Sequence, residues 1–325
     1  MSDKIEQQIQ ISQGLRPTQA NLTYDLESAL ESIVSVRARI PDDAFTASFL
    51  GTDRSGHGVR ILDTGLVVTI GYVIAEAEEI WLIGANGQAV TAHVVGYDYE
   101  TGFGLVQPLA QMNLPNLDLG DSDLISTGDK VVVAGCGGIS QSLDATVIAK
   151  REFAGYWEYV LDEAIFTSPP HPDWGGAALI SATGQLVGIG SLYVENVAPK
   201  IAAGNMIVPI NILKPIMKEM LDYGTTLKSP RPWLGLFVTE SPENLVVAGV
   251  LDGGPAEQAD VRTGDVVIGV AGERTRDLAD FFRRIWSQGE AGSEIPIMIY
   301  RDGATFDVHI SSIDRRAQFK SPELH

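Results

Sequence analysis

The segment Gly58-Val-Arg-Ile-Leu-Asp-Thr-Gly-Leu-Val-Val-Thr-Ile70 consists of two short apolar runs joined by a turn. Both runs are rich in Val, Ile and Leu, and the Asp63-Thr-Gly sequence between them is typical of a turn. Similar runs recur at 80–83 and 130–135, again bounded by Gly, Asn or Asp. Many short strands separated by such turns predict an all-β barrel or sandwich between about residues 44 and 200.

Helices are expected at both ends of this β region. Apolar residues at helical spacing predict a short first helix from Leu26 to Val34, with Asn21 or Thr23 as its cap. A second apolar stripe predicts a helix from Pro209 to Tyr223, ended by Gly224 as C-cap.

The chain then divides at a linker rich in proline. Residues 225–232 read Thr-Thr-Leu-Lys-Ser-Pro-Arg-Pro, which favours an extended connection. Beyond it, short strands mix with two helices, at Ala256–Ala259 and at Leu278–Trp286, the second capped by Asp277. We therefore predict a flexible N-terminus at 1–20, a β-rich domain at 21–224, the linker at 225–232, a second domain at 233–313 and a polar tail at 314–325.

Length and composition agree with two domains and limit the possible partners. A chain of 325 residues exceeds what a single core usually serves. Its net charge of -19 argues against nucleic acid and anionic membrane surfaces, which both require a basic footprint. With Cys136 as the only cysteine, no internal disulfide forms. The polar start contains no visible signal peptide, so we expect a cytoplasmic protein, or a periplasmic one if a leader was removed.

A series of segments in the first domain follows the order of a known protease family. They are Gly58–Ile74, Val94-Val-Gly-Tyr-Asp, Leu119-Gly-Asp-Ser-Asp, Gly175-Gly-Ala-Ala-Leu-Ile-Ser-Ala-Thr-Gly-Gln-Leu-Val-Gly-Ile and Met206-Ile-Val-Pro-Ile. Together with Gly254-Pro-Ala-Glu-Gln-Ala-Asp-Val-Arg-Thr-Gly-Asp-Val-Val-Ile in the second domain, they resemble the HtrA/Deg family of trypsin-like serine proteases with a C-terminal PDZ domain. The resemblance covers roughly residues 25–313. It implies a mainly β protein, with a chymotrypsin-like double β-barrel followed by a PDZ domain.

The same resemblance places other residues where the family has its catalytic triad. Tyr72 stands at the position of the histidine, Gly102 at that of the aspartate and Gly175 at that of the serine. Acyl transfer requires a hydroxyl or thiol activated by a neighbouring base, and glycine has no side-chain oxygen. A phenol with a pKa of about 10 is a poor proton acceptor near neutral pH. We therefore predict that the chain is not an enzyme but a degenerate family member, a pseudoprotease.

The PDZ resemblance implies a site for peptides. Trp233-Leu-Gly-Leu-Phe237 resembles the carboxylate-binding loop, in which consecutive backbone N–H groups capture a C-terminal carboxylate. An extended peptide then pairs with the following strand, and Gly235 permits close approach of its backbone. The helix at 278–286 forms the other wall. We place Phe282 in the groove, because Leu278, Phe281 and Ile285 complete a core stripe without it.

Other titratable residues give weaker signals. Ser168, His171 and Asp173 lie shortly before Gly175 among several prolines, which predicts a stiff, polar surface loop; the alternative is a hydrolase with a relocated nucleophile. His57 is isolated in the sequence and is expected to be structural. No histidine, cysteine or carboxylate spacing indicates a metal, and no nucleotide motif is complete, so no cofactor is expected.

Three functions remain open at this point. The first is a non-catalytic scaffold that binds C-terminal or extended peptide segments of other proteins through the PDZ domain. The second is a holdase-type chaperone, and the third is a serine-type endopeptidase with a relocated catalytic site. The resemblance further implies a possible homotrimer, formed through the N-terminal part of the protease domain.

Overall fold

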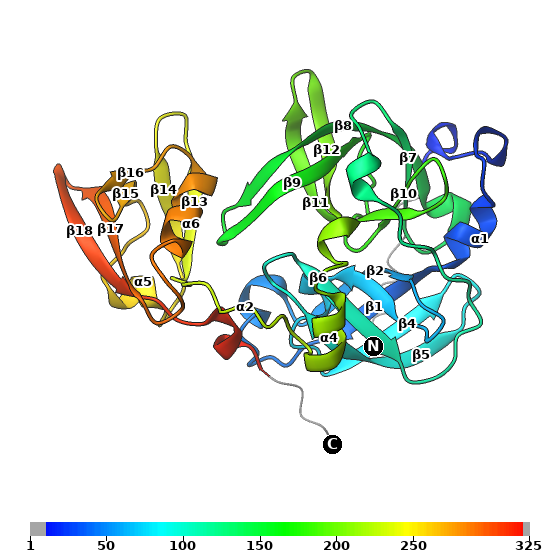
Figure 1. Ribbon diagram of the computed structural model, residues 1–325, viewed down its shortest axis with the longest axis horizontal. Coiled ribbons are helices and arrows are strands. Elements are labelled where there is room, and N and C mark those ends of the chain that lie inside the picture. Colours follow the sequence, from blue (N-terminus) through cyan, green and yellow to red (C-terminus); the bar gives the residue numbers. More distant parts are fainter. Residues whose placement is uncertain (1–10, 321–325) are drawn as a thin grey trace, which may run out of the picture. The chain divides into compact units, whose positions relative to one another are not determined.

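The computed structural model describes residues 11–320, which form two compact units (Figure 1). The first contains residues 11–151 and 163–226, and the second contains Glu152–Asp162 and Leu227–Lys320. The expected flexible N-terminus and polar tail therefore lie partly outside the described residues. Of the described part of that N-terminus, Ile11 is buried and its N–H donates to Ser140 O.

The first unit begins with a closed barrel of six strands. The order around it is β1-β2-β3-β6-β5-β4, with every neighbouring pair antiparallel. The strands are β1 (Ile33–Arg39), β2 (Asp53–Arg60), β3 (Val67–Ile70), β4 (Glu79–Gly84), β5 (Ala89–Tyr97) and β6 (Phe103–Pro108). Along β1, buried Val34, Val36 and Ala38 alternate with more exposed neighbours, so one face of the strand fills the barrel.

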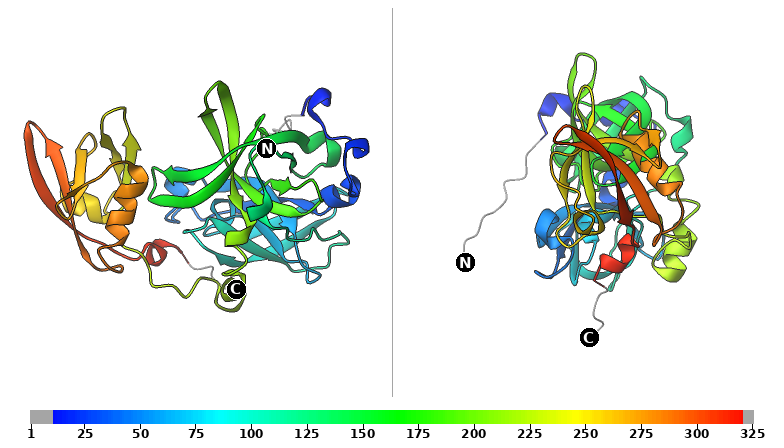
Figure 2. Two further views of the ribbon diagram at one scale, coloured as in Figure 1. Left: turned by 45° about the horizontal axis from the view of Figure 1, so that its top comes forward. Right: turned by 90° about the vertical axis from the view of Figure 1, so that its left-hand side faces the viewer.

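A second barrel of six strands follows, in the order β10-β11-β12-β9-β8-β7. Its strands are β7 (Lys130–Ala134), β8 (Ser142–Gly155), β9 (Tyr159–Ser168), β10 (Ala178–Ile180), β11 (Leu186–Ala198) and β12 (Ile201–Pro209). The pairs β8–β9 and β11–β12 are long hairpins, and β11–β12 extends beyond the barrel (Figure 2). Their length was not visible in the sequence, because their ends alternate among small, polar and aromatic residues without a continuous apolar run.

Short helices accompany the barrels: α1 (Leu26–Glu31), α2 (Ala47–Leu50), α3 (Gly71–Ile74) and α4 (Met217–Tyr223). The α1 cap is Asp25 rather than Asn21 or Thr23, and the helix is shorter than predicted because Ile33 and Val34 begin β1. Gly224 ends α4 with a φ of 75°, as its C-cap role requires. Single turns of 3₁₀-helix lie at Gln13–Leu15, Gln19–Asn21, Ser122–Leu124, Gly138–Gln141, Ile210–Ile212 and Arg315–Gln318.

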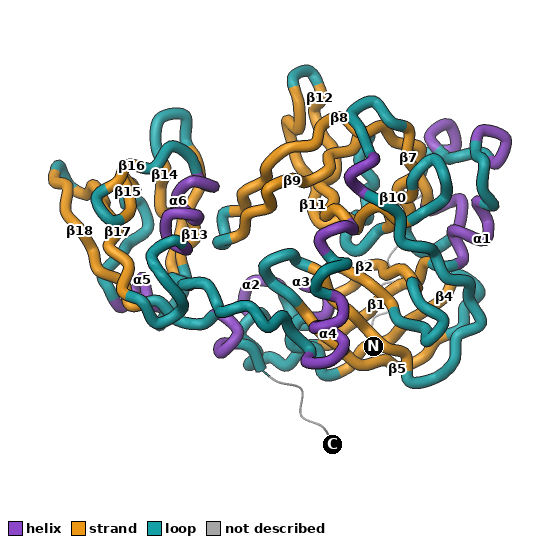
Figure 3. The backbone as a smooth tube through the Cα atoms, in the orientation of Figure 1, coloured by secondary structure: helices purple, strands orange, loops and turns teal. Residues whose placement is uncertain are grey.

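The second unit is a sheet with two helices, and strands dominate both units (Figure 3). The sheet order is β13-β14-β15-β17-β18, with β16 paired to β15. The elements are β13 (Leu236–Glu240), β14 (Leu245–Val250), α5 (Pro255–Gln258), β15 (Val266–Val270), β16 (Glu273–Arg274), α6 (Leu278–Trp286), β17 (Glu294–Arg301) and β18 (Ala304–Ser311). Asp277 caps α6 as predicted, since its carboxylate accepts the Asp280 N–H at 2.7 Å.

The architecture confirms the predicted fold class. Both closed barrels and the smaller sheet have separate apolar cores, and strands greatly outnumber helices among the described residues. The structure is therefore a chymotrypsin-like double β-barrel followed by a PDZ domain.

Candidate functional site

The three positions aligned with the triad lie close together in the first unit. Tyr72 is in α3, Gly102 precedes β6 and Gly175 precedes β10. The Tyr72 hydroxyl donates to Ser191 O at 2.9 Å and lies 2.9 Å from the place that a Cβ would take on Gly175. Gly71, beside Tyr72, donates its N–H to Gly102 O at 2.6 Å. The fold thus brings these three residues together, with the Tyr72 phenol beside Gly175, and their correspondence to the triad stays a prediction.

The loop that carries Gly175 is held tightly against β2. Gly175 O accepts the His57 N–H at 2.7 Å. Gly176 has a φ of 79°, and a Cβ there would lie 1.9 Å from His57 O, so only glycine fits. Trp174 O accepts the Ala177 N–H at 3.1 Å. Backbone contacts therefore fix the position of Gly175, which has no side chain of its own.

His57 and Asp173 form a contact that the sequence did not reveal. His57 is buried, its Nδ1 accepts the Cys136 N–H at 3.1 Å, and its Nε2 lies 3.0 Å from Asp173 Oδ2. Because Nδ1 is an acceptor, the proton of a neutral ring is on Nε2, the nitrogen that is close to the Asp173 carboxylate. The structural role expected for His57 stays a prediction.

Ser168 and His171 have separate partners. The Ser168 hydroxyl donates to Ala203 O at 3.1 Å, whereas His171 Nε2 contacts Gln141 O at 3.0 Å and its Nδ1 accepts the Asp173 N–H at 3.1 Å. His171 is fully buried. The predicted surface loop is therefore wrong at this residue, because Asn205 and Gln141 supply it with buried hydrogen-bond partners.

The charges at this site follow from burial and from the His57 contact. Burial and the nearby Asp173 carboxylate raise the pKa of Tyr72 well above its usual range, so the phenol keeps its proton at neutral pH. Burial lowers the pKa of His171. The contact with His57 lowers the pKa of Asp173, whose side chain is 51% exposed. The Asp173 carboxylate is therefore ionised at neutral pH and can accept a hydrogen bond from a bound molecule.

The second candidate site is the loop that leads into β13. The Leu234 and Leu236 N–H groups both donate to the Glu158 carboxylate, at 3.2 and 3.0 Å, and the Gly235 N–H contributes as well. Glu158 is in the turn between β8 and β9, within the segment that belongs to the second unit. The predicted carboxylate-binding loop therefore contacts a carboxylate in this structure.

The other predicted groove residues are largely buried. Trp233 and Ile313 exchange two backbone N–H···O hydrogen bonds, each 3.1 Å long. The centroid of the Phe237 ring lies 6.1 Å from that of Tyr156. Phe282 is 0% exposed, in an apolar cluster with residues of β13 and of the β8–β9 turn region. Its assignment to the groove wall stays a prediction.

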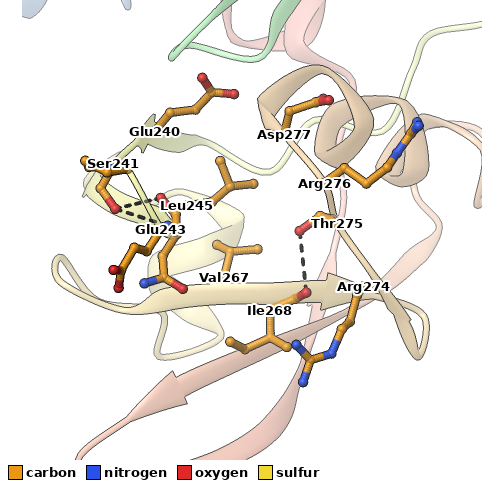
Figure 4. A pocket seen from close by; sticks show the side chains of 12 residues that line it. Glu240, Ser241, Glu243, Leu245, Val267, Ile268, Arg274, Thr275, Arg276 and Asp277 are labelled. Carbon is orange, nitrogen blue, oxygen red and sulfur yellow. Dashed lines mark hydrogen bonds between the residues drawn. The ribbon is translucent and has the colours of Figure 1, made fainter.

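A cavity lies at the far end of β13 (Figure 4). It measures about 300 Å³, and its wall combines the turn after Glu240 with the segment that precedes α6. Acidic and basic side chains both line it, among them Glu240, Glu243, Arg274 and Arg276. A peptide that pairs antiparallel with β13 and ends at Leu234–Leu236 would direct its upstream residues towards this cavity.

Two protein-family models match the chain. "Trypsin-like peptidase domain" covers residues 56–189, and "PDZ domain" covers residues 232–311. The fold and both matches therefore define a trypsin-like peptidase domain joined to a PDZ domain.

Similar proteins narrow this class. "Probable periplasmic serine protease do/HhoA-like" from Haemophilus influenzae is 25% identical over 82% of this chain and 61% of its own length. "Periplasmic pH-dependent serine endoprotease DegQ" from Escherichia coli is 24% identical over 92% of this chain and 71% of its own. The solved structure "HtrA-type protease AlgW with tripeptide" has the same fold, with a TM-score of 0.53 and 22% identity over 91% of this chain and 97% of that one. The chain is thus similar to HtrA-type proteases over most of its length.

These relatives contradict the prediction that the chain is not an enzyme. The similar proteins are named as serine proteases or endoproteases, and their similarity extends over most of this chain. The prediction rested on Tyr72, Gly102 and Gly175 alone. These three replacements do not by themselves establish loss of activity, and the relatives named as serine proteases overturn that prediction.

The relatives also bear on the setting of the protein. Both are named as periplasmic, so the cytoplasmic prediction is not supported. Across residues 11–320, none of the helices is long and apolar enough to cross a bilayer.

Proposed function

We propose that this HtrA-type protein binds peptide segments of other proteins through the loop at 233–237 and the adjoining edge of β13. One observation carries the proposal: the Leu234, Gly235 and Leu236 N–H groups converge on one carboxylate. A peptide C-terminus presents the same group, and charge-assisted hydrogen bonds to it are stronger than neutral ones. Solved structures with the same fold, of the HtrA-type protease AlgW with a tripeptide and with a decapeptide, give further support.

The test compares two forms of one peptide. A fluorescein-labelled peptide with the sequence of residues 150–157, Lys-Arg-Glu-Phe-Ala-Gly-Tyr-Trp, is made with a free C-terminus and with an amide. Fluorescence polarisation with the full chain is expected to show at least about tenfold tighter binding of the free acid, because hydrogen bonds to a charged group contribute about 1.5–3 kcal/mol. Equal affinity of the two forms would count against carboxylate recognition.

A second candidate function is hydrolysis of peptides in the first unit. Its support is the ionised Asp173 carboxylate beside Tyr72 and Gly175, together with the names of the relatives. Since Gly175 has no hydroxyl, a water molecule beside Asp173 would be the nucleophile. Its oxygen would bond to the peptide carbonyl carbon as the C–N bond breaks, and the carboxylate would take a proton from the water and pass it to the leaving amine. This differs from the serine-type mechanism with Ser168 as nucleophile, for which no contact between Ser168 and His171 is seen.

Cleavage of unfolded casein tests this candidate. The wild-type chain is expected to cleave casein, and Asp173→Asn to lower the rate by at least about tenfold through loss of the proton acceptor. Glu163→Gln is the matched control, because Glu163 is a surface residue paired with Lys150. Intact casein after incubation with the wild type would refute the candidate, and equal rates in both variants would remove Asp173 from the mechanism.

The names of the relatives favour a periplasmic setting for these functions, the alternative that the sequence left open. The proposed partners are peptide segments of other proteins, whether the protein is periplasmic or cytoplasmic.

A further inference from the structure

The turn between β8 and β9 lies along β13 in the manner of a PDZ ligand. Tyr156 O accepts the Val238 N–H at 3.0 Å, and the Glu158 carboxylate accepts the Leu236 N–H at 3.0 Å. Residue 156 is thus opposite 238 and residue 158 opposite 236, so this segment runs antiparallel to the strand. A peptide with its C-terminal carboxylate at Leu234–Leu236 would have the same direction.

Apolar and charged contacts complete this arrangement. Val160 is buried in the apolar cluster that also contains Leu236, Val238 and Phe282. On α6, Arg283 forms ion pairs with Glu152 and with Asp162, one from each strand of the hairpin.

The turn at residues 156–158 has an unusual backbone conformation and close ring packing. Glu158 has a φ of 61°, which a non-glycine residue rarely adopts and which turns its side chain back to the loop. The Trp157 ring stacks on Tyr159 with centroids 5.7 Å apart, and a Cβ on Gly155 would lie 2.7 Å from the Trp157 ring. The segment is therefore compact, and the Trp157 ring leaves no room for a side chain at Gly155.

We propose that the segment Glu152–Asp162 is an internal ligand of the PDZ groove, in which the Glu158 side chain takes the place of a peptide C-terminus. The inference rests on the proposed peptide-binding function and adds its regulation. A peptide from another protein reaches the loop only when this segment leaves it. Its apparent affinity is therefore reduced by the fraction of molecules in which the groove is open.

Removal of the Glu158 carboxylate tests the competition. The labelled free-acid peptide of residues 150–157 is titrated into the wild-type chain and into Glu158→Ala. We expect the variant to bind at least about tenfold more tightly, because the closed state loses the hydrogen bonds that the Glu158 side chain accepts. Arg283→Ala, which leaves the loop intact, is expected to tighten binding by less than about fivefold, as the loss of exposed ion pairs would. Glu163→Gln, on the same hairpin but outside the segment, is expected to have the wild-type Kd.

Hydrogen exchange tests, without any added peptide, whether the segment occupies the groove. Hydrogen exchange of the Leu234, Leu236 and Val238 amides is expected to be at least about tenfold faster in Glu158→Ala than in the wild type, with β17 and β18 unchanged. Circular dichroism of Glu158→Gln and Glu158→Ala checks that both variants fold.

The two measurements separate the possible failures. Unchanged exchange at these three amides, or an unchanged Kd in a variant that binds the peptide, would overturn the internal ligand. Faster exchange without peptide binding by any variant would support the internal ligand but refute the proposed peptide-binding function.

Discussion

At the scale of single residues, the decisive features are small and local. Gly175 is opposite the Tyr72 hydroxyl, and Glu158 places a carboxylate among backbone N–H groups. The sequence predicts the triad positions from the motifs on either side of them, and that assignment stays a prediction. The contacts of Glu158 could not be predicted in this way, since its partner Leu234 is 76 residues away along the chain.

The close approach of Tyr72 and Gly175 predicts that their substitutions are coupled. Gly175→Ser adds a Cβ 2.9 Å from the Tyr72 hydroxyl oxygen and is expected to destabilise the chain by about 1–3 kcal/mol through overpacking. In the Tyr72→His background the smaller ring should remove most of this cost. Urea unfolding of the two single variants and the double variant gives the coupling free energy. Additive effects would show that the residues are not in contact.

Glu158 predicts a dependence of peptide binding on pH. Burial raises its pKa to about 7, and it outweighs the opposing effects of the loop N–H groups and of Arg315, which faces the carboxylate. A group whose pKa is higher in the docked state favours docking fully below its ordinary pKa, and this advantage is lost as the pH rises through about 7.

Peptide affinity of the wild type should therefore increase from about pH 5 to pH 8, relative to Glu158→Gln. The ratio of the two Kd values, measured by polarisation across this range, isolates Glu158 from titration of the peptide. A constant ratio would mean that Glu158 does not titrate with docking.

At the scale of elements, local signals were reliable where they were complete. The α6 helix has the predicted bounds and the predicted Asp277 cap. The first helix was predicted too long because apolar residues at 33 and 34 fit a helical stripe but belong to β1. A short apolar run fits both the helical and the strand periodicity, so the sequence does not distinguish a helix from a strand there. Pairing with β2 and β4 makes residues 33 and 34 part of a strand.

The α6 cap gives a quantitative prediction. Asp277→Ala removes the acceptor of the Asp280 N–H and is expected to lower the free energy of unfolding by about 1 kcal/mol. Urea denaturation measures the change. Asp307→Ala, an exposed substitution on β18, is the matched control and should remain within about 0.5 kcal/mol of the wild type. Equal effects of both substitutions would contradict a specific capping role.

At the scale of the whole molecule, the chain is acidic and divides into two compact units. One segment of the β8–β9 hairpin, Glu152–Asp162, groups with the PDZ domain even though it lies between strands of the second barrel in sequence. The linear order of domains predicted from the linker contains no sign of this. The homotrimer also belongs to this scale and stays a prediction.

Sedimentation equilibrium tests the assembly. A homotrimer predicts a mass of three times the 34.9 kDa of one chain. A mass of one chain over a wide range of concentrations would rule the trimer out for this protein.

The sequence by itself determined the β-rich character, the α6 cap and the likeness to HtrA-type proteases, because turn residues, apolar periodicity and motif order act over a few residues. Only the tertiary structure decided which strands close each barrel, that His57 meets Asp173, and that Glu158 enters the PDZ loop. These contacts join residues far apart in the chain. They form because buried polar groups must find hydrogen-bond partners once the strands are packed, and local sequence patterns contain no information about which distant partner is near.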